Sequence, residues 1–231
     1  TGLNVDGGMA EYMVSGWEAL IAVPKGMAAD QVGPLLCAGT TTFNSLRNMK
    51  LTPGEWVAVQ GVGGLGHLAV QFAAKMGYRV IVLSTSADKE KFARQLGAQG
   101  FIDTSTEEIV PALMKLTAGQ GVRCVVATAG SGKAMSSVIE ALGVDGILLA
   151  LGAGADPIQA WSGQLIHNNR RIQGWASGGP NDGEECLEFA QAFGVKVEVE
   201  RFPLEKAGEA YDKMNANQLR YRAVLVPEHK Q

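Results

Sequence analysis

Gly61-Val-Gly-Gly-Leu-Gly66 lies where a hydrophobic segment, Trp56 to Gln60, gives way to an amphipathic helical pattern that begins at Leu65. In the pattern G-x-G-x-x-G the first glycine permits a tight turn, the second lets a pyrophosphate approach the main chain, and the third lets the helix lie close to the strand. The unpaired N–H groups and the dipole at the start of the helix then favour a bound anion. Because strand, glycines and helix follow in this order, the stretch predicts a dinucleotide-binding loop rather than a flexible glycine-rich turn.

Strand-like and helix-like patterns alternate through the segment that surrounds this loop. The predicted strands cover 56–60, 79–83, 100–103, 122–127, 146–151 and 171–174, and the helices between them cover 65–76, 88–96, 107–116 and 133–142. The strands are β-branched or apolar runs, and the helices carry apolar residues at offsets of three and four. Six strands joined by crossover helices make two mononucleotide-binding halves, so the sequence predicts an α/β fold with a doubly wound, parallel Rossmann sheet.

The two ends of the chain differ from this central segment. Residues 1–38 carry strand and turn signals, whereas residues from about 176 onward predict two helices and two strands, with the last strand at 222–226. The first residues do not resemble the start of a folding unit, and we expect a piece of a longer protein.

The overall composition narrows the class of protein. With 231 residues, of which 46% are hydrophobic, the chain can bury a sizeable core. A formal charge of −3 with interspersed signs argues against a nucleic-acid partner. Without an apolar run of about 18 residues, we expect a cytoplasmic protein with no membrane partner. Three cysteines without CxxC spacing predict reduced thiols, not a disulfide framework or a self-contained zinc cluster.

The end of the second predicted strand indicates which dinucleotide is bound. An acidic residue that accepts hydrogen bonds from the adenosine ribose usually stands there, but this chain has Ser84. Ser84, Thr85 and Ser86 offer hydroxyl donors, and Lys89 offers a cation, to a ribose phosphate. The segment therefore favours NADP(H) over NAD(H). The alternative is that these residues form a serine/threonine turn that caps the helix, with Lys89 solvated.

Four stretches of the chain together resemble one family. They are Gly7-Gly-Met-Ala-Glu-Tyr12, Pro34-Leu-Leu-Cys-Ala-Gly-Thr-Thr41, Gly61-Val-Gly-Gly-Leu-Gly-His67 and Leu219-Arg-Tyr-Arg-Ala-Val-Leu225. They resemble the zinc-dependent alcohol dehydrogenases of the medium-chain dehydrogenase/reductase superfamily, over the whole length of the chain. Ser84-Thr-Ser86 with Lys89 most resembles the cinnamyl-alcohol-dehydrogenase branch, whose members use NADP(H).

The resemblance implies a domain organisation and a metal site. Residues 1–38 and 176–231 would be parts of a GroES-like catalytic domain that is split in sequence, and residues 39–175 would form the Rossmann domain. Cys37 matches the last protein ligand of the catalytic zinc, and a thiolate is a proper zinc ligand. In family members the other ligands lie upstream of where this chain starts, so Cys37 is the one metal-binding and catalytic residue assigned here. A buried, structural thiol is the alternative for Cys37.

Further cofactor residues come from the resemblance and from the expected fold. The resemblance places Thr41 near the nicotinamide ring, Gly152 and Ala153 at its carboxamide, and Arg222 at the pyrophosphate, with a solvated charge as the alternative for Arg222. Thr128 follows the fourth strand and falls at the crevice where a doubly wound sheet binds its ligand. The assigned cofactor residues are Thr41, Gly61, Gly63, Gly64, Leu65, Gly66, Ser84, Thr85, Ser86, Lys89, Thr128, Gly152, Ala153 and Arg222. His67 is expected on the helix near the phosphates and not at a metal.

The favoured function is an oxidoreductase, an NADP(H)-dependent alcohol dehydrogenase or aldehyde reductase acting at a catalytic zinc. Two alternatives stay open: a cofactor-binding module without catalysis, and a zinc-free reductase of the same superfamily. The small-molecule alcohol or aldehyde is not identified, although Leu151, Trp161 and Trp175 are candidates to line its pocket. Residues 168–174 are expected to form an edge strand that, as is common in the superfamily, pairs between two subunits of a homodimer; an ordinary closing strand is the alternative.

Overall fold

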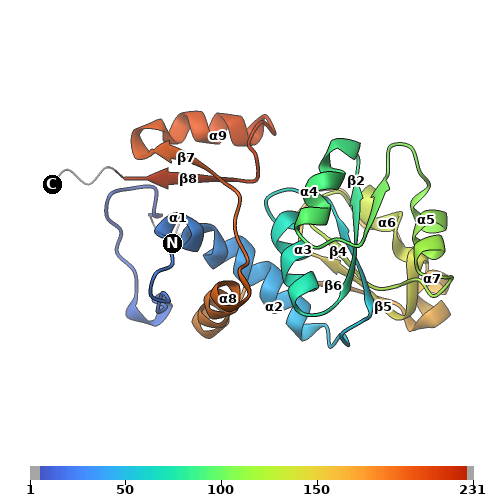
Figure 1. Ribbon diagram of the computed structural model, residues 1–231. Helices are drawn as coiled ribbons and strands as arrows, with labels where there is room; N and C mark the ends of the chain where they lie inside the picture. The colour runs from blue at the N-terminus through green and yellow to red at the C-terminus, as the bar shows by residue number, and fades with distance from the viewer. Residues whose placement is uncertain (1–5, 228–231) are drawn as a thin grey trace. The chain divides into compact units, whose positions relative to one another are not determined.

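The computed structural model of this chain describes residues 6–227. Within that range the chain divides into two units, one formed by residues 6–40 together with 178–227 and the other by residues 41–177 (Figure 1). The divisions fall two residues beyond the predicted boundaries at 38/39 and 175/176. Whether the first unit is a GroES-like domain stays a prediction.

The second unit contains one parallel sheet in the strand order β3-β2-β1-β4-β5-β6. All five neighbouring pairs are parallel. The order reverses between β1 and β4, which is the topological switch point of a doubly wound sheet. This confirms the predicted Rossmann fold. The strands are β1 (Trp56–Gln60), β2 (Arg79–Ser84), β3 (Gly100–Asp103), β4 (Val122–Ala127), β5 (Leu142–Ala150) and β6 (Arg171–Gly174).

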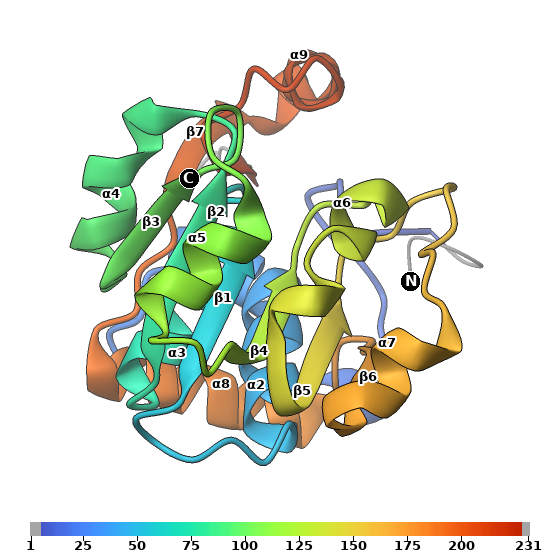
Figure 2. The same cartoon turned by 90° about the vertical axis from the view of Figure 1, so that its right-hand side faces the viewer.

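The central strands are buried on both faces, as an all-parallel sheet requires. Alternate residues of the strands point to opposite faces. On one face, Ala58, Val125 and Leu148 belong to a core shared with residues of α5 (Ile109–Leu116) and α6 (Gly132–Ser136), and α5 lies in front of the sheet in Figure 2. On the other side, α3 (Gly66–Lys75) contacts β1 and β2. The remaining helices of this unit are α2 (Thr40–Asn48), which begins in the first unit, α4 (Glu90–Gln95) and α7 (Ser162–Ile166).

Two sequence predictions in this unit are wrong at their boundaries. The helix predicted at 133–142 is divided into α6 and the 3₁₀ turn η4 (Ile139–Ala141), and β5 begins at Leu142 instead of at residue 146. Leu142 pairs with Val122 before the register of β4 and β5 shifts. Gly143 makes this pairing fit, because a Cβ there would stand 2.4 Å from the carbonyl oxygen of Gln120. Apolar periodicity could not reveal this, since it depends on a backbone contact between distant segments.

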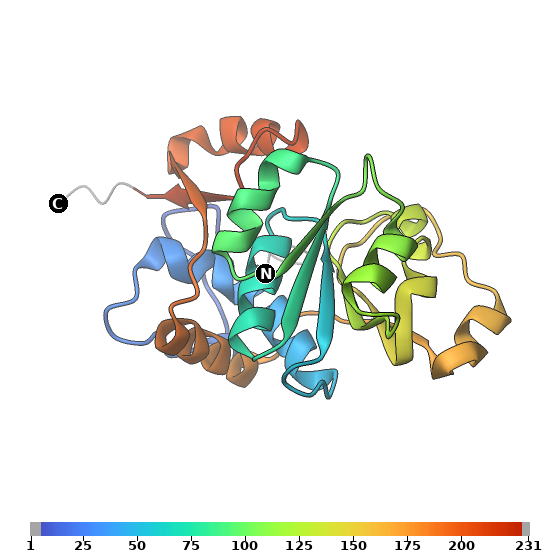
Figure 3. The same cartoon turned by 45° about the vertical axis from the view of Figure 1, so that its right-hand side comes forward.

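The first unit contains the two helices and two strands predicted after residue 176. They are α8 (Pro180–Phe193), β7 (Val199–Pro203), α9 (Ala207–Asn215) and β8 (Arg222–Val226). β7 and β8 pair in parallel, and α9 lies along the pair (Figure 3). Gln31 of α1 (Ala29–Pro34) exchanges two hydrogen bonds with the main chain of Val197, at 3.0 and 2.9 Å.

The strands expected near the start of the chain are not found. Between residues 6 and 38 the structure contains the 3₁₀ turn η1 (Trp17–Ala19), α1 and part of the π-helical turn η2 (Leu35–Gly39), and no strand. Large apolar side chains of this segment, such as Tyr12, Val14 and Trp17, are exposed. Within residues 6–227, no helix is both long enough and apolar enough to cross a lipid bilayer.

Candidate functional site

The glycine loop joins β1 to α3 at the switch point of the sheet. Gly61 has φ +92°, which an L side chain rarely adopts, and its N–H donates to the carbonyl of Leu83 at 2.8 Å. A Cβ at Gly66 would stand 1.9 Å from the carbonyl oxygen of Gly61, so the helix approaches the turn main chain to main chain. At Gly63 a Cβ would meet nothing within 4 Å. The loop is therefore tight where the helix packs and open at its second glycine, which fits a pyrophosphate.

Two polar side chains hold this loop from within the unit. The hydroxyl of Thr128 donates to the carbonyl of Gln60 at 2.9 Å and lies 3.2 Å from the carbonyl oxygen of Gly61. Thr128 thus follows β4 beside the switch point with its hydroxyl bonded to the loop main chain, and its role towards a cofactor stays a prediction. His67 is fully buried, and its Nδ1 lies 2.9 Å from the carbonyl oxygen of Gly63. The sequence placed His67 near the phosphates but did not reveal this bond.

The end of β2 forms a serine turn, which is one part of the alternative to a phosphate site, but Ser86 and Lys89 make no side-chain capping bond to the helical residues that follow them. The buried Ser84 hydroxyl accepts a hydrogen bond from the N–H of Ser86 at 3.2 Å. Thr85 is exposed, and Lys89, the last residue of the 3₁₀ turn η3 (Ala87–Lys89), is half-buried. The turn uses the hydroxyl of Ser84 and leaves that of Thr85 at the surface. The segment can therefore be a structural turn and still offer Thr85 and Lys89 to a ribose phosphate.

The loops after β4 and β5 pack against each other through glycine. A Cβ at Gly130 would stand 2.0 Å from the carbonyl oxygen of Ala153, and one at Gly152 would stand 2.4 Å from the carbonyl carbon of Ala129. The N–H of Gly152 donates to the carbonyl of Ala127 at 3.1 Å. Gly152 therefore has its amide committed to the sheet. Sequence analysis did not single out Gly130, because its role depends on a loop 23 residues later in the chain.

The start of α6 is held by side chains that the sequence analysis missed. The carboxylate of Asp156 accepts a hydrogen bond from the N–H of Lys133 at 3.0 Å, and bonds to the N–H groups of Lys133 and Gly132 hold the pKa of Asp156 below its ordinary value. The hydroxyl of Ser136 accepts from the N–H of Gln159 at 2.8 Å. These bonds fasten α6 to the loop that follows β5.

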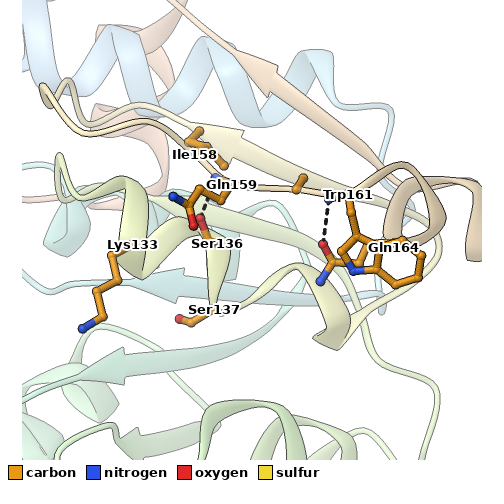
Figure 4. Close-up of a pocket in the computed structure, with 8 residues that line it drawn as sticks. Lys133, Ser136, Ser137, Ile158, Gln159, Trp161 and Gln164 are labelled. Atoms are coloured by element: carbon orange, nitrogen blue, oxygen red, sulfur yellow. Dashed lines mark hydrogen bonds between the residues drawn. The ribbon is translucent and has the colours of Figure 1, made fainter.

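A shallow hollow of about 720 Å³ lies between α6 and residues 158–164 (Figure 4). Trp161, which is 65% exposed, stands at its rim with its ring over the Cα of Gly163. None of the cofactor residues assigned from the sequence lines this hollow. It is lined by Lys133, Ser136, Ser137, Ile158, Gln159, Ala160, Trp161 and Gln164. Trp175 donates its indole N–H to the carbonyl of Ser177 at 3.2 Å. The assignment of Trp161, Trp175 and Leu151 to a substrate pocket stays a prediction.

Cys37 and Arg222 belong to the first unit. Cys37 is exposed in η2, so it is not the buried thiol that was its alternative. Burial lowers the pKa of Arg222, and the charge of Cys37 acts in the opposite direction. A catalytic zinc takes about three protein ligands, and residues 6–227 contain no group of three or more His, Cys, Asp or Glu side chains that could hold a metal. The described residues thus do not by themselves fit a zinc site.

The other two cysteines are buried, Cys124 in β4 and Cys186 in α8. Burial raises the pKa of Cys124 to about 12, which keeps it a neutral thiol. Thr41, assigned to the nicotinamide, is buried in the first turn of α2. Packing, not metal binding, explains Cys124 and Cys186, and the role of Thr41 stays a prediction.

The strand order and the glycine loop define a protein of the Rossmann class. The chain belongs to the zinc-binding dehydrogenase family, whose model matches residues 64–192. This confirms the resemblance to zinc-type alcohol dehydrogenases of the medium-chain superfamily.

Named relatives agree with this family. The chain is 44% identical over 225 residues to the alcohol dehydrogenase patD of Penicillium expansum, covering 97% of this chain and 65% of that protein. It resembles the crystal structure of the alcohol dehydrogenase from the archaeon Aeropyrum pernix with a TM-score of 0.89 and 31% identity, covering 98% of this chain and 67% of that one. It also resembles CAD from Helicobacter pylori complexed with NADP(H), with a TM-score of 0.76 and 26% identity, covering 89% and 57%. The chain thus spans about two thirds of the length of the Penicillium relative.

Proposed function

We propose that this chain binds NADP(H) and serves an alcohol dehydrogenase or aldehyde reductase, in which hydride passes between a nicotinamide and an alcohol or aldehyde. The observation that carries the proposal is the glycine loop, which is open at Gly63 and closed at Gly66. Open main chain beside the start of a helix suits a pyrophosphate. The reaction class is supported by the names of the Penicillium and Aeropyrum relatives, both alcohol dehydrogenases.

The preference for NADP(H) is part of the same proposal. β2 ends at Ser84 and not at an acidic residue that would repel a ribose phosphate, and Thr85 and Lys89 follow with a hydroxyl and a cation. Asp103, which pairs with Ser84 from β3, has its carboxylate bonded to Ser105. The Helicobacter relative is described as complexed with NADP(H). Both observations favour NADP(H), with NAD(H) as the alternative.

The residues of this chain would bind and orient the cofactor. When bound, a nicotinamide supplies the carbon that accepts or donates hydride. The N–H groups of residues 63–66 would hold the pyrophosphate, and the crevice at Thr128, Gly152 and Ala153 would orient the nicotinamide half and exclude water from it. Thr128 and His67 keep the loop in shape through their bonds to its carbonyls.

The second candidate is a cofactor-binding module without turnover. The observation in its favour is that residues 6–227 offer no group of three metal ligands. The exposed Cys37 favours the first candidate instead, because it can complete a zinc site whose other ligands lie outside the described residues. The third candidate is a reductase that transfers hydride without zinc.

One set of measurements on the 231-residue polypeptide separates these candidates. We expect NADPH to bind saturably and to quench the fluorescence of the protein, because the whole glycine loop and the sheet that carries it belong to this polypeptide. We further expect bound zinc, measured by mass spectrometry, and alcohol-dependent reduction of NADP⁺ to occur together or not at all. NADPH binding with neither identifies the module, and turnover without zinc identifies the zinc-free reductase. A polypeptide that does not bind NADPH refutes the proposal.

A homodimer formed through β6 is also proposed. β6 is an end strand of the sheet, and Ile166, which precedes it by five residues, is an exposed apolar residue. An unprotected edge strand is a template for pairing with a second strand. Sedimentation is expected to give twice the 24.3 kDa mass of one chain. A single monomeric species at micromolar concentration would show that β6 is an ordinary closing strand.

A further inference from the structure

The side chain of Gln60 links the strand that leads into the glycine loop to α6. Gln60 is the last residue of β1 and is 8% exposed. Its Nε2 donates to the carbonyl of Ala134 at 2.8 Å. Its own carbonyl accepts from the hydroxyl and the N–H of Thr128, at 2.9 and 3.2 Å. One residue therefore contacts the first turn of α6 with its side chain and anchors the start of the glycine loop with its main chain.

The far side of α6 is fastened to the loop after β5. Asp156 accepts from the N–H of Lys133, and Ser136 accepts from the N–H of Gln159, a bond that Figure 4 draws as a dashed line. A Cβ at Gly132 would stand 2.4 Å from the carbonyl oxygen of Pro157, so helix and loop are also in main-chain contact there. α6 cannot shift without moving residues 156–159.

These contacts form a continuous series, called here the relay, at the carboxyl ends of the strands. It runs from the glycine loop through Gln60 to α6, and from α6 through Asp156 and Ser136 to the loop after β5. The glycine loop would hold the pyrophosphate, whereas the loop after β5 lies where the nicotinamide half is expected. Coupling between two sites is carried by packed elements and hydrogen bonds of this kind.

We propose that Gln60 is a positioning residue that couples the two halves of the dinucleotide site through α6. The inference rests on the proposed binding of NADP(H). Without the Gln60 amide, the loop after β5 is no longer held at a fixed position relative to the glycine loop. A ligand that contacts both loops then binds less tightly. A ligand that reaches only the glycine loop and the end of β2 is unaffected.

The test compares NADPH with 2′,5′-ADP, a fragment that carries only the adenosine half. Gln60→Met keeps the length of the side chain and removes its donor. We expect about tenfold weaker binding of NADPH, within the range of measured coupling between sites, and an affinity for 2′,5′-ADP within about twofold of the wild type. Gln71→Met is the matched control, because Gln71 is as buried as Gln60 but lies on α3, outside the relay. It is expected to leave the ratio of the two affinities unchanged.

Asp156→Ala tests the other end of the relay at an exposed position, so its result does not depend on whether Gln60→Met folds. It is expected to weaken NADPH and to spare 2′,5′-ADP in the same way. Equal weakening of both ligands by either variant, or no weakening of NADPH, would overturn the coupling. If the wild-type protein binds neither ligand, the cofactor site itself is refuted, which is a separate outcome.

Discussion

Gly66→Ala is expected to abolish measurable NADPH binding and to lower the free energy of unfolding by about 3 kcal/mol. The new Cβ would stand 1.9 Å from the carbonyl oxygen and 2.8 Å from the carbonyl carbon of Gly61, and 3.2 Å from the hydroxyl oxygen of Thr128. Overpacking usually costs about 1–3 kcal/mol. Here the cost lies at the upper end, because the atoms that must yield are main chain of Gly61, which directly follows β1 and whose carbonyl oxygen lies 3.2 Å from the Thr128 hydroxyl, and not the tip of a flexible side chain.

The measurements are urea unfolding and NADPH titration, with Gly63→Ala as the matched control. A Cβ at Gly63 meets nothing within 4 Å, so this variant should keep its free energy of unfolding within about 0.5 kcal/mol of the wild type. It should nevertheless bind NADPH more weakly, because the methyl group enters the space proposed for the pyrophosphate. A Gly66→Ala protein with wild-type binding would contradict the close packing of α3. Unchanged NADPH binding by Gly63→Ala would contradict the proposal that the pyrophosphate binds at this loop.

The sheet could be predicted because its strands are local signals. Residues 79–84 and 122–127 are nearly continuous apolar, β-branched runs, and the structure buries them on both faces of a parallel sheet. The glycine loop could be predicted equally well, since Gly61, Gly63 and Gly66 each have a known role in a strand–turn–helix unit that binds a dinucleotide. The parallel, doubly wound arrangement then followed from the alternation of strands and helices.

Contacts between distant segments could not be predicted in the same way. Gln60 is simply the end of a strand in the sequence, and only the fold brings Ala134 within 2.8 Å of its amide. Gly130 and Gly132 likewise follow a strand as ordinary turn residues, yet each admits a main-chain segment from the loop after β5. The strands predicted within residues 6–38 are wrong for a different reason. Their local apolar signals do not become strands, because these residues pair with no other strand in the described part of the chain.

Lys89→Ala is expected to weaken NADPH binding by about 10- to 100-fold and to leave NADH binding within about twofold of the wild type. A hydrogen bond to a charged group contributes about 1.5–3 kcal/mol, and each 1.4 kcal/mol is about tenfold in affinity. Since Lys89 is half-buried and partly screened by solvent, the effect should lie nearer the lower limit. NADH has no 2′-phosphate and therefore loses nothing. Raising the salt concentration should reduce the difference between the two cofactors in the wild type and hardly change it in the variant.

Lys91→Ala is the matched control, because it removes the same charge from an exposed position two residues away in α4. A general loss of positive potential would make both variants weaken NADPH alike, whereas a direct contact with the 2′-phosphate makes the loss specific to Lys89. If Lys89→Ala changes the affinity for neither cofactor, the turn formed by Ser84 and Ser86 has only a structural role, with a solvated lysine beside it. With Ser84 in place of an acidic last residue of β2, NAD(H) and NADP(H) would then bind nearly equally, and cofactor choice would have to come from residues outside this turn.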